Sequence, residues 1–266
     1  MKVVLFCGGQ GLRLRELSET IPKPMVTIGY RPLLWHVMRY YAHFGHKEFI
    51  LCLGYKADII KEYFLRYNAA LSNDFVLTGA GRSGGAVELL VPDIEEWQIS
   101  FIDTGLQANI GQRLKAVEPY LGDDEMFLAN YGDVVTDAPL DELTDDFAAK
   151  GKVAAFMSVR PTNYSFHFVH FKGDGLVSRM ESVESSDVWI NGGHFMFRRE
   201  IFDYMQPGEE LVVEPFRRLI RADQLMAYRY RGFWAPMDTL KDVQMLETLW
   251  QSGAPPWAVW QPRPTT

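Results

Sequence analysis

Apolar runs and amphipathic segments alternate along the first 150 residues of the chain. Short apolar runs predict buried strands at residues 3–7, 48–53, 75–78, 99–103 and 126–130. Apolar residues three or four positions apart predict helices at residues 32–44, 57–67 and 111–121. Strands that alternate with helices favour a mostly parallel sheet with helices on both faces, in which ligands bind at the carboxyl ends of the strands.

The pattern becomes richer in strands after Gly151. It predicts strands at residues 152–159, 166–171 and 194–197, and helices near residues 213–220 and 240–250. Because no linker rich in Pro, Gly or Ser separates the halves, we expect one domain over residues 1–253, with an α/β half at 1–150 and a β-rich half at 151–253. The tail, residues 254–266, contains four prolines, and we expect it to be extended, with Trp257 and Trp260 packed on the body.

The charge balance restricts the ligands that the protein can bind. The 266 residues include 27 Lys or Arg and 34 Asp or Glu, which gives a formal net charge of −7. This balance argues against a protein that binds nucleic acid or an anionic membrane through bulk charge. An anionic ligand therefore needs a local cluster of cations.

The cysteines and the first residues of the chain bear on its location. Cys7 and Cys52 each lie in an apolar run, which favours packed thiols in a reducing compartment over a disulfide. The apolar run at residues 3–7 is too short for a signal peptide or a membrane span. We therefore expect a cytoplasmic protein that is not inserted in a membrane.

Three glycines, Gly8, Gly9 and Gly11, follow the first predicted strand. Glycine lets backbone N–H groups approach an anion or a flat base without interference from a Cβ atom. The spacing does not match a dinucleotide-binding fingerprint, because Leu14 occupies the place of the third glycine, nor a P-loop, because Gly-Lys-Ser/Thr is absent. A tight strand-to-helix turn without a ligand is the alternative interpretation.

Cations gather directly after this glycine loop. Arg13, Arg15 and Lys23 lie within eleven residues, and Pro22 and Pro24 restrict the backbone on either side of the lysine. In an acidic chain such a cluster provides the counter-charge for a triphosphate. Solvated side chains on a turn are the alternative.

Several longer motifs occur in a fixed order along the chain. They are GGQGLRL from residue 8, IPKPMVTIGYRPLLWHVM from 21, GYKADIIKEYF from 54, DTG from 103, GQRLKAV from 111, YGD from 131, INGG from 190 and GFWAPMDTL from 232. With them the chain resembles the sugar-1-phosphate nucleotidylyltransferases over nearly its whole length, and among these the glucose-1-phosphate cytidylyltransferase branch. The resemblance implies a Rossmann-like α/β fold of the nucleotide-diphospho-sugar transferase type, in which residues 1–150 bind nucleotide and residues 151–253 bind the acceptor. It also implies a homo-oligomer.

The reaction implied by the resemblance is attack of a sugar phosphate on the α-phosphorus of a nucleoside triphosphate, with release of pyrophosphate. Such chemistry needs positioning and charge neutralisation rather than a covalent protein nucleophile. For this chain it implies CTP, glucose 1-phosphate or a related sugar 1-phosphate, and Mg²⁺. The same reaction with UTP or dTTP and a non-hexose phosphate acceptor are close alternatives. A catalytically silent nucleotide-binding protein is an alternative of another class.

The resemblance also assigns roles to individual residues. It implies that Arg13 and Lys23 hold the triphosphate, and that Asp133 and Asp238 share Mg²⁺, which prefers oxygen ligands. The other implied contacts are to the nucleotide, by Gly8, Gly9, Gly11 and Arg113, and to the acceptor, by Asn191 and Glu214. Each aspartate taken alone could instead cap a helix.

One departure from the family affects the acceptor side. Family members usually carry Glu-Lys-Pro shortly before INGG, and the lysine position is Ser182 in this chain. No lysine occurs between Arg179 and Arg198, so we expect Arg179 or Lys172 to supply a cation to the acceptor. Otherwise the acceptor differs from a plain hexose 1-phosphate.

Two smaller departures concern the walls of the site. The aromatic run YSFHFVHF, residues 164–171, contains His167 and His170 where the cytidylyltransferases have a more glycine-containing stretch. We expect these side chains to form core or pocket wall, and a zinc site is the less favoured interpretation because no Cys or third His is near in sequence. Leu12 replaces a threonine that relatives usually place beside the triphosphate.

Overall fold

The computed structural model describes residues 1–9, 20–80, 85–91, 93–161, 167–183 and 186–261. Its centre is a seven-stranded sheet with the strand order β14-β10-β13-β8-β1-β4-β7. These strands are β14 (Leu225–Tyr230), β10 (Ala154–Val159), β13 (Ile190–Arg198), β8 (Met126–Asn130), β1 (Val3–Phe6), β4 (Glu48–Leu53) and β7 (Gln98–Asp103). Only β13 pairs antiparallel with both neighbours, so the predicted mostly parallel α/β sheet is confirmed.

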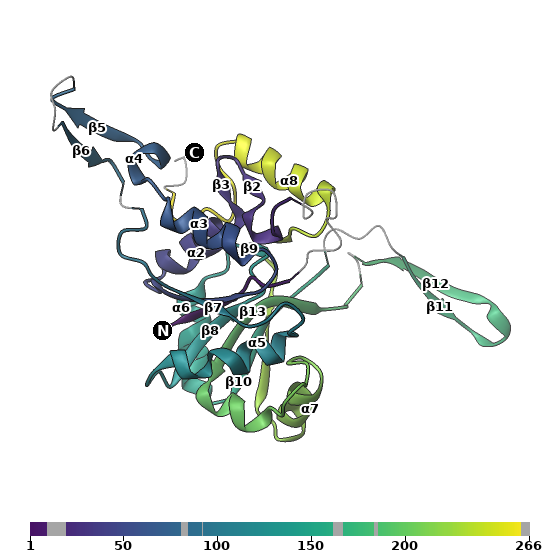
Figure 1. Ribbon diagram of the computed structural model, residues 1–266. Helices are drawn as coiled ribbons and strands as arrows, with labels where there is room; N and C mark the ends of the chain where they lie inside the picture. Colours follow the sequence, from purple (N-terminus) through teal and green to yellow (C-terminus); the bar gives the residue numbers. More distant parts are fainter. Residues whose placement is uncertain (10–19, 81–84, 92, 162–166, 184–185, 262–266) are drawn as a thin grey trace.

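Helices cover both faces of this sheet, and Figure 1 shows α2, α3 and α8 on one side and α5 and α7 on the other. The α-helices are α2 (Leu33–His43), α3 (Ala57–Leu65), α4 (Ala69–Ser72), α5 (Ile110–Val117), α6 (Leu140–Lys150), α7 (Glu214–Arg221) and α8 (Leu240–Gln251). Alternate residues of β1 enter different cores, because Val3 and Leu5 pack with α2 while Val4 packs with α5. Burial on both faces explains why this strand is a continuous apolar run.

Short strands and turns link the main elements. Two ladders pair β2 (Thr27–Ile28) with β3 (Arg31–Pro32), and β9 (Val134–Thr136) with β15 (Trp234–Pro236). Short 3₁₀ helices occur at Lys23–Met25, Glu118–Leu121, Gly173–Gly175 and Arg199–Tyr204. None of the helices that the described residues form is long and apolar enough to cross a bilayer.

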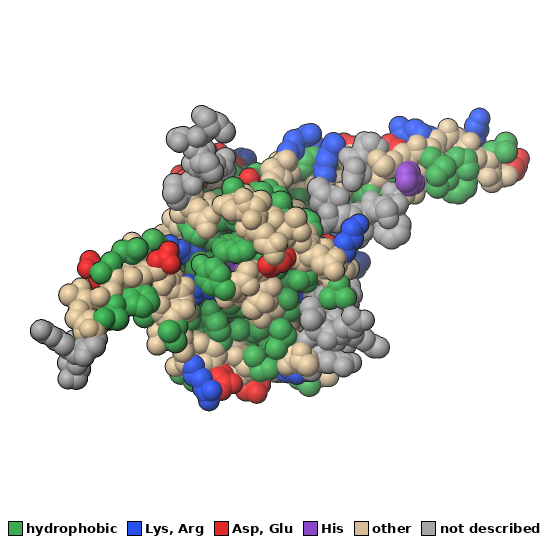
Figure 2. All heavy atoms as spheres, turned by 90° about the horizontal axis from the view of Figure 1, so that it is seen from above, with side chains coloured by type: hydrophobic (Ala, Val, Ile, Leu, Met, Phe, Trp, Pro, Cys, Tyr) green, Lys and Arg blue, Asp and Glu red, His purple; other side chains and the backbone are tan. Residues whose placement is uncertain are grey.

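Two antiparallel hairpins extend from opposite sides of the body (Figure 1). One pairs β5 (Phe75–Thr78) with β6 (Ala86–Leu89), and the other pairs β11 (His167–Phe171) with β12 (Val177–Ser182). The strand predicted at residues 75–78 is therefore present, but it belongs to a hairpin and not to the central sheet. Exposed apolar side chains cover both hairpins, as Figure 2 shows.

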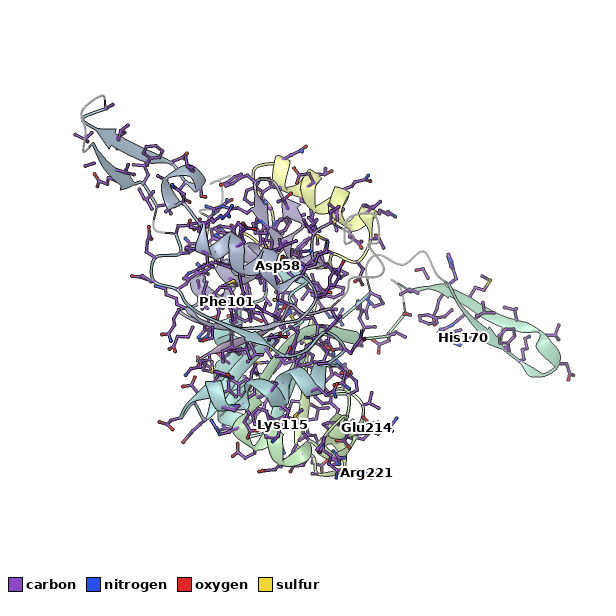
Figure 3. All side chains as sticks on the ribbon, in the orientation of Figure 1. Asp58, Phe101, Lys115, His170, Glu214 and Arg221 are labelled. Atoms are coloured by element: carbon purple, nitrogen blue, oxygen red, sulfur yellow. The ribbon has the colours of Figure 1, made fainter. Side chains whose placement is uncertain are left out.

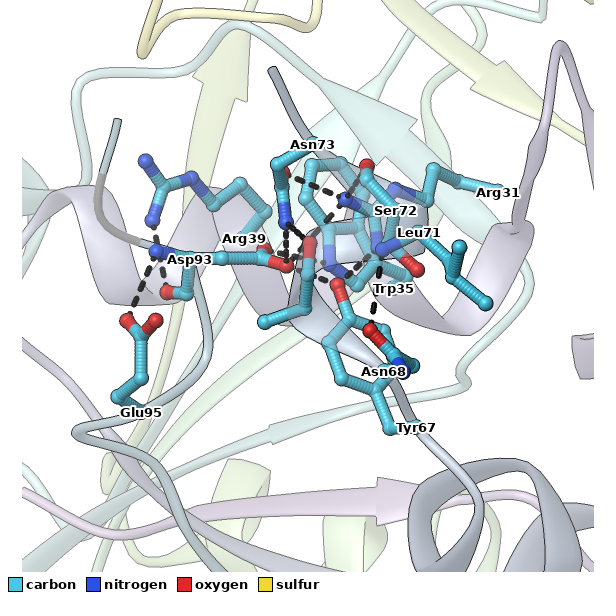
Figure 4. Close-up of polar contacts among 11 residues, drawn as sticks. Arg31, Trp35, Arg39, Tyr67, Asn68, Leu71, Ser72, Asn73, Asp93 and Glu95 are labelled. Carbon is cyan, nitrogen blue, oxygen red and sulfur yellow. Dashed lines mark hydrogen bonds and ion pairs between the residues drawn. The ribbon is translucent and has the colours of Figure 1, made fainter. Parts of the chain in front are cut away.

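The first hairpin is anchored at its base by a buried ion pair, shown in Figure 4. The side chains of Arg31 and Asp93 are each 2% exposed, and Arg31 Nη2 lies 3.3 Å from Asp93 Oδ2. Arg31 also donates hydrogen bonds to Ser72 O and Asn73 Oδ1, at 2.6 and 2.8 Å, and its guanidinium packs on the ring of Trp35. These contacts fix both ends of the hairpin to β3 and to the start of helix α2.

The C-terminal tail folds back on the body, as expected from its tryptophans. Trp257 is 1% exposed, and its Nε1 donates a hydrogen bond to Nδ1 of His36 at 3.3 Å. The expected extended conformation is wrong for the described part, because backbone hydrogen bonds from Ala258 N to Pro255 O and from Gln261 N to Ala258 O form turns. Residues 262–266 lie outside the described residues.

Candidate active site

A pocket of about 630 Å³ opens at the carboxyl ends of β1 and β8. Cys7 and Gly9, which follow β1, and Tyr131 and Asp133, which follow β8, form part of its wall. The loop before helix α5 forms the opposite wall. This is the edge of a parallel sheet at which ligands bind.

Lys23 joins the two predicted metal-binding aspartates at this pocket. Its Nζ donates hydrogen bonds to Asp133 Oδ2 at 2.7 Å and to Asp238 Oδ1 at 2.6 Å. Burial lowers the pKa of Lys23, but the two carboxylates raise that pKa more, so the net shift is upward. Lys23 therefore remains a cation at physiological pH.

The backbone around the two aspartates explains why they meet. Asp133 precedes β9 and Asp238 follows β15, and these two strands pair directly, with Val134 opposite Pro236. A backbone hydrogen bond of 2.9 Å from Met237 N to Asp133 O closes the end of this ladder. The pairing places two residues that are distant in sequence on the same side of the pocket.

Neither aspartate caps a helix in the described structure, although capping was the alternative for both. Helix α8 is capped by Thr239, whose side chain forms a capping box with Asp242. The residue at the N-cap of α6 is Pro139, with no side-chain cap. Both residues instead line the pocket.

Arg113 lies in the pocket wall, but its guanidinium holds protein atoms together. Nη1 donates to Leu53 O at 3.1 Å and to Thr104 Oγ1 at 2.7 Å, and Nη2 donates to Gly8 O at 3.0 Å. These acceptors lie at the carboxyl ends of three neighbouring strands, so one side chain fixes the chain where β1, β4 and β7 end. Burial lowers the pKa of Arg113, the shift expected for a cation surrounded by neutral acceptors.

Gly8 needs the absence of a side chain for this arrangement. A Cβ atom at Gly8 would lie 2.0 Å from Arg113 Nη1, whereas a Cβ atom at Gly9 would meet no atom of the described residues within 4 Å. The glycine at position 8 therefore permits a close protein contact, and Gly9 is open to the pocket. Gly11 and Arg13 lie outside the described residues.

On the acceptor side, Asn191 is fixed beside the pocket at the start of β13. Its Nδ2 donates to the hydroxyl of Tyr131 at 3.1 Å, and its Oδ1 accepts from Gly193 N at 2.9 Å. Tyr131 lines the pocket, and burial raises the pKa of its hydroxyl, which stays protonated. Tyr131 belongs to the YGD motif, but sequence analysis assigned it no role.

Glu214 does not line the pocket, but a glutamate that sequence analysis missed does. Glu214 is the first residue of α7, and its Oε2 accepts a hydrogen bond from Glu210 N at 3.3 Å. Glu210 itself lies in the pocket wall, and burial raises its pKa. No sequence motif marks Glu210, and only the path of the chain before α7 brings it to the site.

Arg179 is not brought to the pocket within this chain. It lies on β12, where it pairs with Glu181, and His170 Nε2 lies 2.8 Å from the same carboxylate. Figure 3 shows His170 on the projecting hairpin, far from the pole of the body at which Glu214 and Lys115 lie. The acceptor role of Arg179 therefore stays a prediction.

Comparisons with known proteins agree with this architecture. Residues 2–243 match the family model described as Nucleotidyl transferase. The chain is 37% identical over 262 residues to the glucose-1-phosphate cytidylyltransferase of Salmonella typhimurium, covering 98% of this chain and 100% of that protein. The enzyme of the same name from Salmonella typhi is also 37% identical, with the same coverage.

A solved structure supports the fold independently. The structure of a UDP-glucose pyrophosphorylase complexed with UDP-glucose superposes with a TM-score of 0.68 at 16% identity, covering 95% of this chain and 98% of that one. Because the family model spans most of the chain and the curated relatives span nearly all of it, the assignment covers both halves of the sheet. This chain belongs to the nucleotidyl transferase family.

Proposed function

We propose that this nucleotidyltransferase couples CTP to a sugar 1-phosphate, glucose 1-phosphate or a related one, to give a CDP-sugar and pyrophosphate. The observation that carries the proposal is the contact of Lys23 with both Asp133 and Asp238 at the pocket. The full-length similarity to glucose-1-phosphate cytidylyltransferases supports CTP as the nucleotide.

Mg²⁺ is the cofactor of this proposal, with Asp133 and Asp238 as its protein ligands. Both carboxylates contact one cation, Lys23, and this shared contact supports the proposal that they also share a metal ion. In this proposal, phosphate oxygens of the substrate complete the coordination. Mg²⁺ characteristically binds through one or two carboxylates and phosphate oxygens, and it neutralises charge on the reacting phosphates.

The chain's own residues then bind and orient the two substrates. The ammonium group of Lys23 can exchange a contact with the carboxylates for a contact with a phosphate oxygen when the triphosphate binds. Gly9 offers an unobstructed backbone at the floor of the pocket. The hydrogen-bonded pair of Tyr131 and Asn191 presents polar groups to the sugar, and positioning of this kind supplies much of the catalysis in phosphoryl transfer.

The decisive experiment measures pyrophosphate release with Mg²⁺ for CTP, UTP, dTTP, ATP and GTP, each with glucose 1-phosphate and with a panel of other sugar 1-phosphates. We expect CTP to give the highest kcat/KM. A higher rate with UTP or dTTP would contradict the choice of base but leave the reaction intact. Nucleotide binding without release of pyrophosphate for any sugar 1-phosphate would support the catalytically silent alternative and overturn the proposal.

We further propose that the protein is a cytoplasmic homo-oligomer. Exposed apolar side chains on the β5–β6 hairpin, including Phe75, Val76 and Leu77, support association between copies. The two free, buried cysteines, Cys7 and Cys52, fit a reducing compartment. Light scattering during size exclusion tests the first point, and a monomer mass at micromolar concentration would contradict it.

A further inference from the structure

Three arginines surround one tryptophan at the far end of the acceptor side. The guanidinium carbons of Arg160, Arg229 and Arg231 each lie 5.5 Å from the ring centroid of Trp189. This distance is within the range of a cation–π contact, so one indole ring holds three cations together. We refer to these three arginines and Trp189 as the arginine cluster.

The arginine cluster lies at the same edge of the sheet as the pocket. Arg160 directly follows β10, Arg229 lies in β14 and Arg231 directly follows that strand. Strands β10 and β14 run in the same direction as β8, so their carboxyl ends share the edge at which Asp133 lies. The cluster therefore faces the side from which substrates enter a sheet of this kind.

The register also places the arginine cluster on the acceptor-binding face. Ser158 pairs with Arg229 on one side and with Asn191 on the other, and Arg160 lies two residues beyond Ser158. Residues two apart in a strand share a face, and on this face Phe156 stacks on Phe216 of α7. The cluster is thus next to the strand that carries Asn191.

Among the described residues, the arginine cluster has more cations than carboxylates around it. Its one described carboxylate contact is Asp187, whose Oδ1 lies 3.2 Å from Arg160 Nη2 and which also interacts electrostatically with Arg229. Nε of Arg160 is buried without a hydrogen-bond partner in the described structure. In the described structure the guanidinium groups of Arg229 and Arg231 donate no hydrogen bond, and both residues are exposed. Three cations beside one carboxylate in a chain of net charge −7 indicate a binding site for an anion.

The distance across the sheet indicates which part of the acceptor carries this anion. β10 and β14 are two and three strands from β8, which is about 10 and 14 Å at the usual strand spacing. The reacting phosphate of the acceptor must approach the triphosphate beside Asp133, so it lies at the near end of this span. The arginine cluster suits a group at the opposite end of the sugar.

We propose that the arginine cluster binds an anionic substituent, a carboxylate or a second phosphate, on the end of the acceptor that is distant from its reacting phosphate. This inference rests on the proposed function. Guanidinium groups bind carboxylates and phosphates through paired hydrogen bonds, so the cluster suits either group. The preferred acceptor is then an acidic sugar 1-phosphate or a sugar bisphosphate.

The test compares glucose 1-phosphate with glucuronic acid 1-phosphate and glucose 1,6-bisphosphate as acceptors, with CTP and Mg²⁺. We expect kcat/KM for at least one of the two acceptors with a second anion to exceed that for glucose 1-phosphate by at least about tenfold, the scale of a charge-assisted contact. The two acceptors distinguish a carboxylate from a phosphate. In the Arg229→Gln/Arg231→Gln variant the ratio should fall to about one, mainly through a higher KM.

A matched control removes two exposed arginines elsewhere, in the Arg66→Gln/Arg221→Gln variant, which should keep the wild-type ratio. A wild-type ratio near one for both acceptors would overturn the inference. Equal loss with all acceptors in the Arg229→Gln/Arg231→Gln variant, or a change in its oligomer mass without a change in the ratio, would also overturn it and indicate a structural role.

A binding measurement separates this inference from the proposed reaction. Calorimetry with the α,β-methylene analogue of CTP should show tighter binding of the preferred acidic acceptor than of glucose 1-phosphate, and the difference should vanish in Arg229→Gln/Arg231→Gln. If no acceptor supports turnover, the proposed function fails, and calorimetry alone then decides whether the arginine cluster binds the second anion.

Discussion

The ammonium group of Lys23 donates a hydrogen bond to the carboxylate of Asp238 across 215 residues of sequence, with an Nζ–Oδ1 distance of 2.6 Å. Because Lys23 contacts Asp133 in the same way, the lysine holds the two carboxylates together until substrates arrive. Substrate binding must therefore exchange one set of ionic contacts for another, and this exchange can be measured.

Replacement of Lys23 by Met should lower turnover and increase the rise in melting temperature that Mg²⁺ causes. We expect kcat/KM to fall at least about a hundredfold, as for other charge-stabilising groups. Without the lysine, the two carboxylates face each other, so Mg²⁺ should raise the melting temperature more than in the wild type. Pyrophosphate release and thermal melting with and without Mg²⁺ check both effects. Lys61→Met is the control, and an equal Mg²⁺ response in both variants would contradict this account of Lys23.

Replacement of either aspartate by asparagine keeps the shape of the side chain and removes its charge. Asp133→Asn and Asp238→Asn should each lower kcat by at least about a hundredfold, because both charges are needed at the reacting phosphates. Steady-state pyrophosphate release measures the effect, with Asp145→Asn on the exposed face of α6 as the matched control. Near-wild-type rates in either active-site variant would contradict the assignment of metal ligands.

Two neighbouring glycines offer a paired test of the packing around Arg113. Gly8→Ala would place its Cβ 2.0 Å from Arg113 Nη1 and 2.9 Å from the carbonyl carbon of Leu53. We expect the free energy of unfolding to fall by about 1–3 kcal/mol, the usual cost of overpacking. The new Cβ of Gly9→Ala meets no atom of the described part of the chain within 4 Å, and this variant should stay close to the wild type in urea denaturation. Equal stabilities of the two variants would show that the contact with Arg113 does not limit the size of the side chain at position 8.

The ion pair of Arg31 and Asp93 should matter far more than an exposed ion pair. Arg31→Leu leaves a buried carboxylate without its cation, which typically costs about 3–5 kcal/mol of unfolding free energy. Arg66 pairs with Glu62 at the surface, and Arg66→Leu should change that free energy by less than about 1 kcal/mol. Urea denaturation of both variants makes the comparison, and similar losses would argue against the anchoring role at the hairpin.

Buried histidines predict a loss of stability in mild acid. Burial lowers the pKa of His36 and of His194 from 6.5 to about 4. The unfolded chain therefore binds protons first as the pH falls from 6.5, and folding stability is lost progressively towards pH 4. Each histidine contributes a slope of up to about 1.4 kcal/mol per pH unit in this window. His194→Asn should flatten the dependence of the urea midpoint on pH, and an unchanged slope would contradict it.

Sequence patterns located the elements that are apolar or periodic, and they missed those that are not. The strand Glu48–Leu53 matches its prediction to the residue, because it is buried on both faces and has no competing helical period. The strand Leu225–Tyr230 was not predicted, because at the edge of the sheet its side chains are partly exposed and Arg229 interrupts the apolar run.

The sequence likewise predicted only part of the candidate site. Motif order singled out Lys23, Asp133 and Asp238, but their mutual contact follows from the pairing of β9 with β15, which no local pattern encodes. The structural role of Arg113 could not be predicted from the sequence either, because several of its acceptors are backbone carbonyls, which any residue provides.

The burial of Trp257 against His36 has a consequence for biosynthesis. The helix that carries His36 is made early, but the indole that covers this histidine is synthesised only 221 residues later. The core between them stays open until Trp257 has been made, so a nascent chain that stops short of Trp257 exposes this surface to chaperones and proteases. Burial of His36 thus depends on a segment that is synthesised long after the helix it covers.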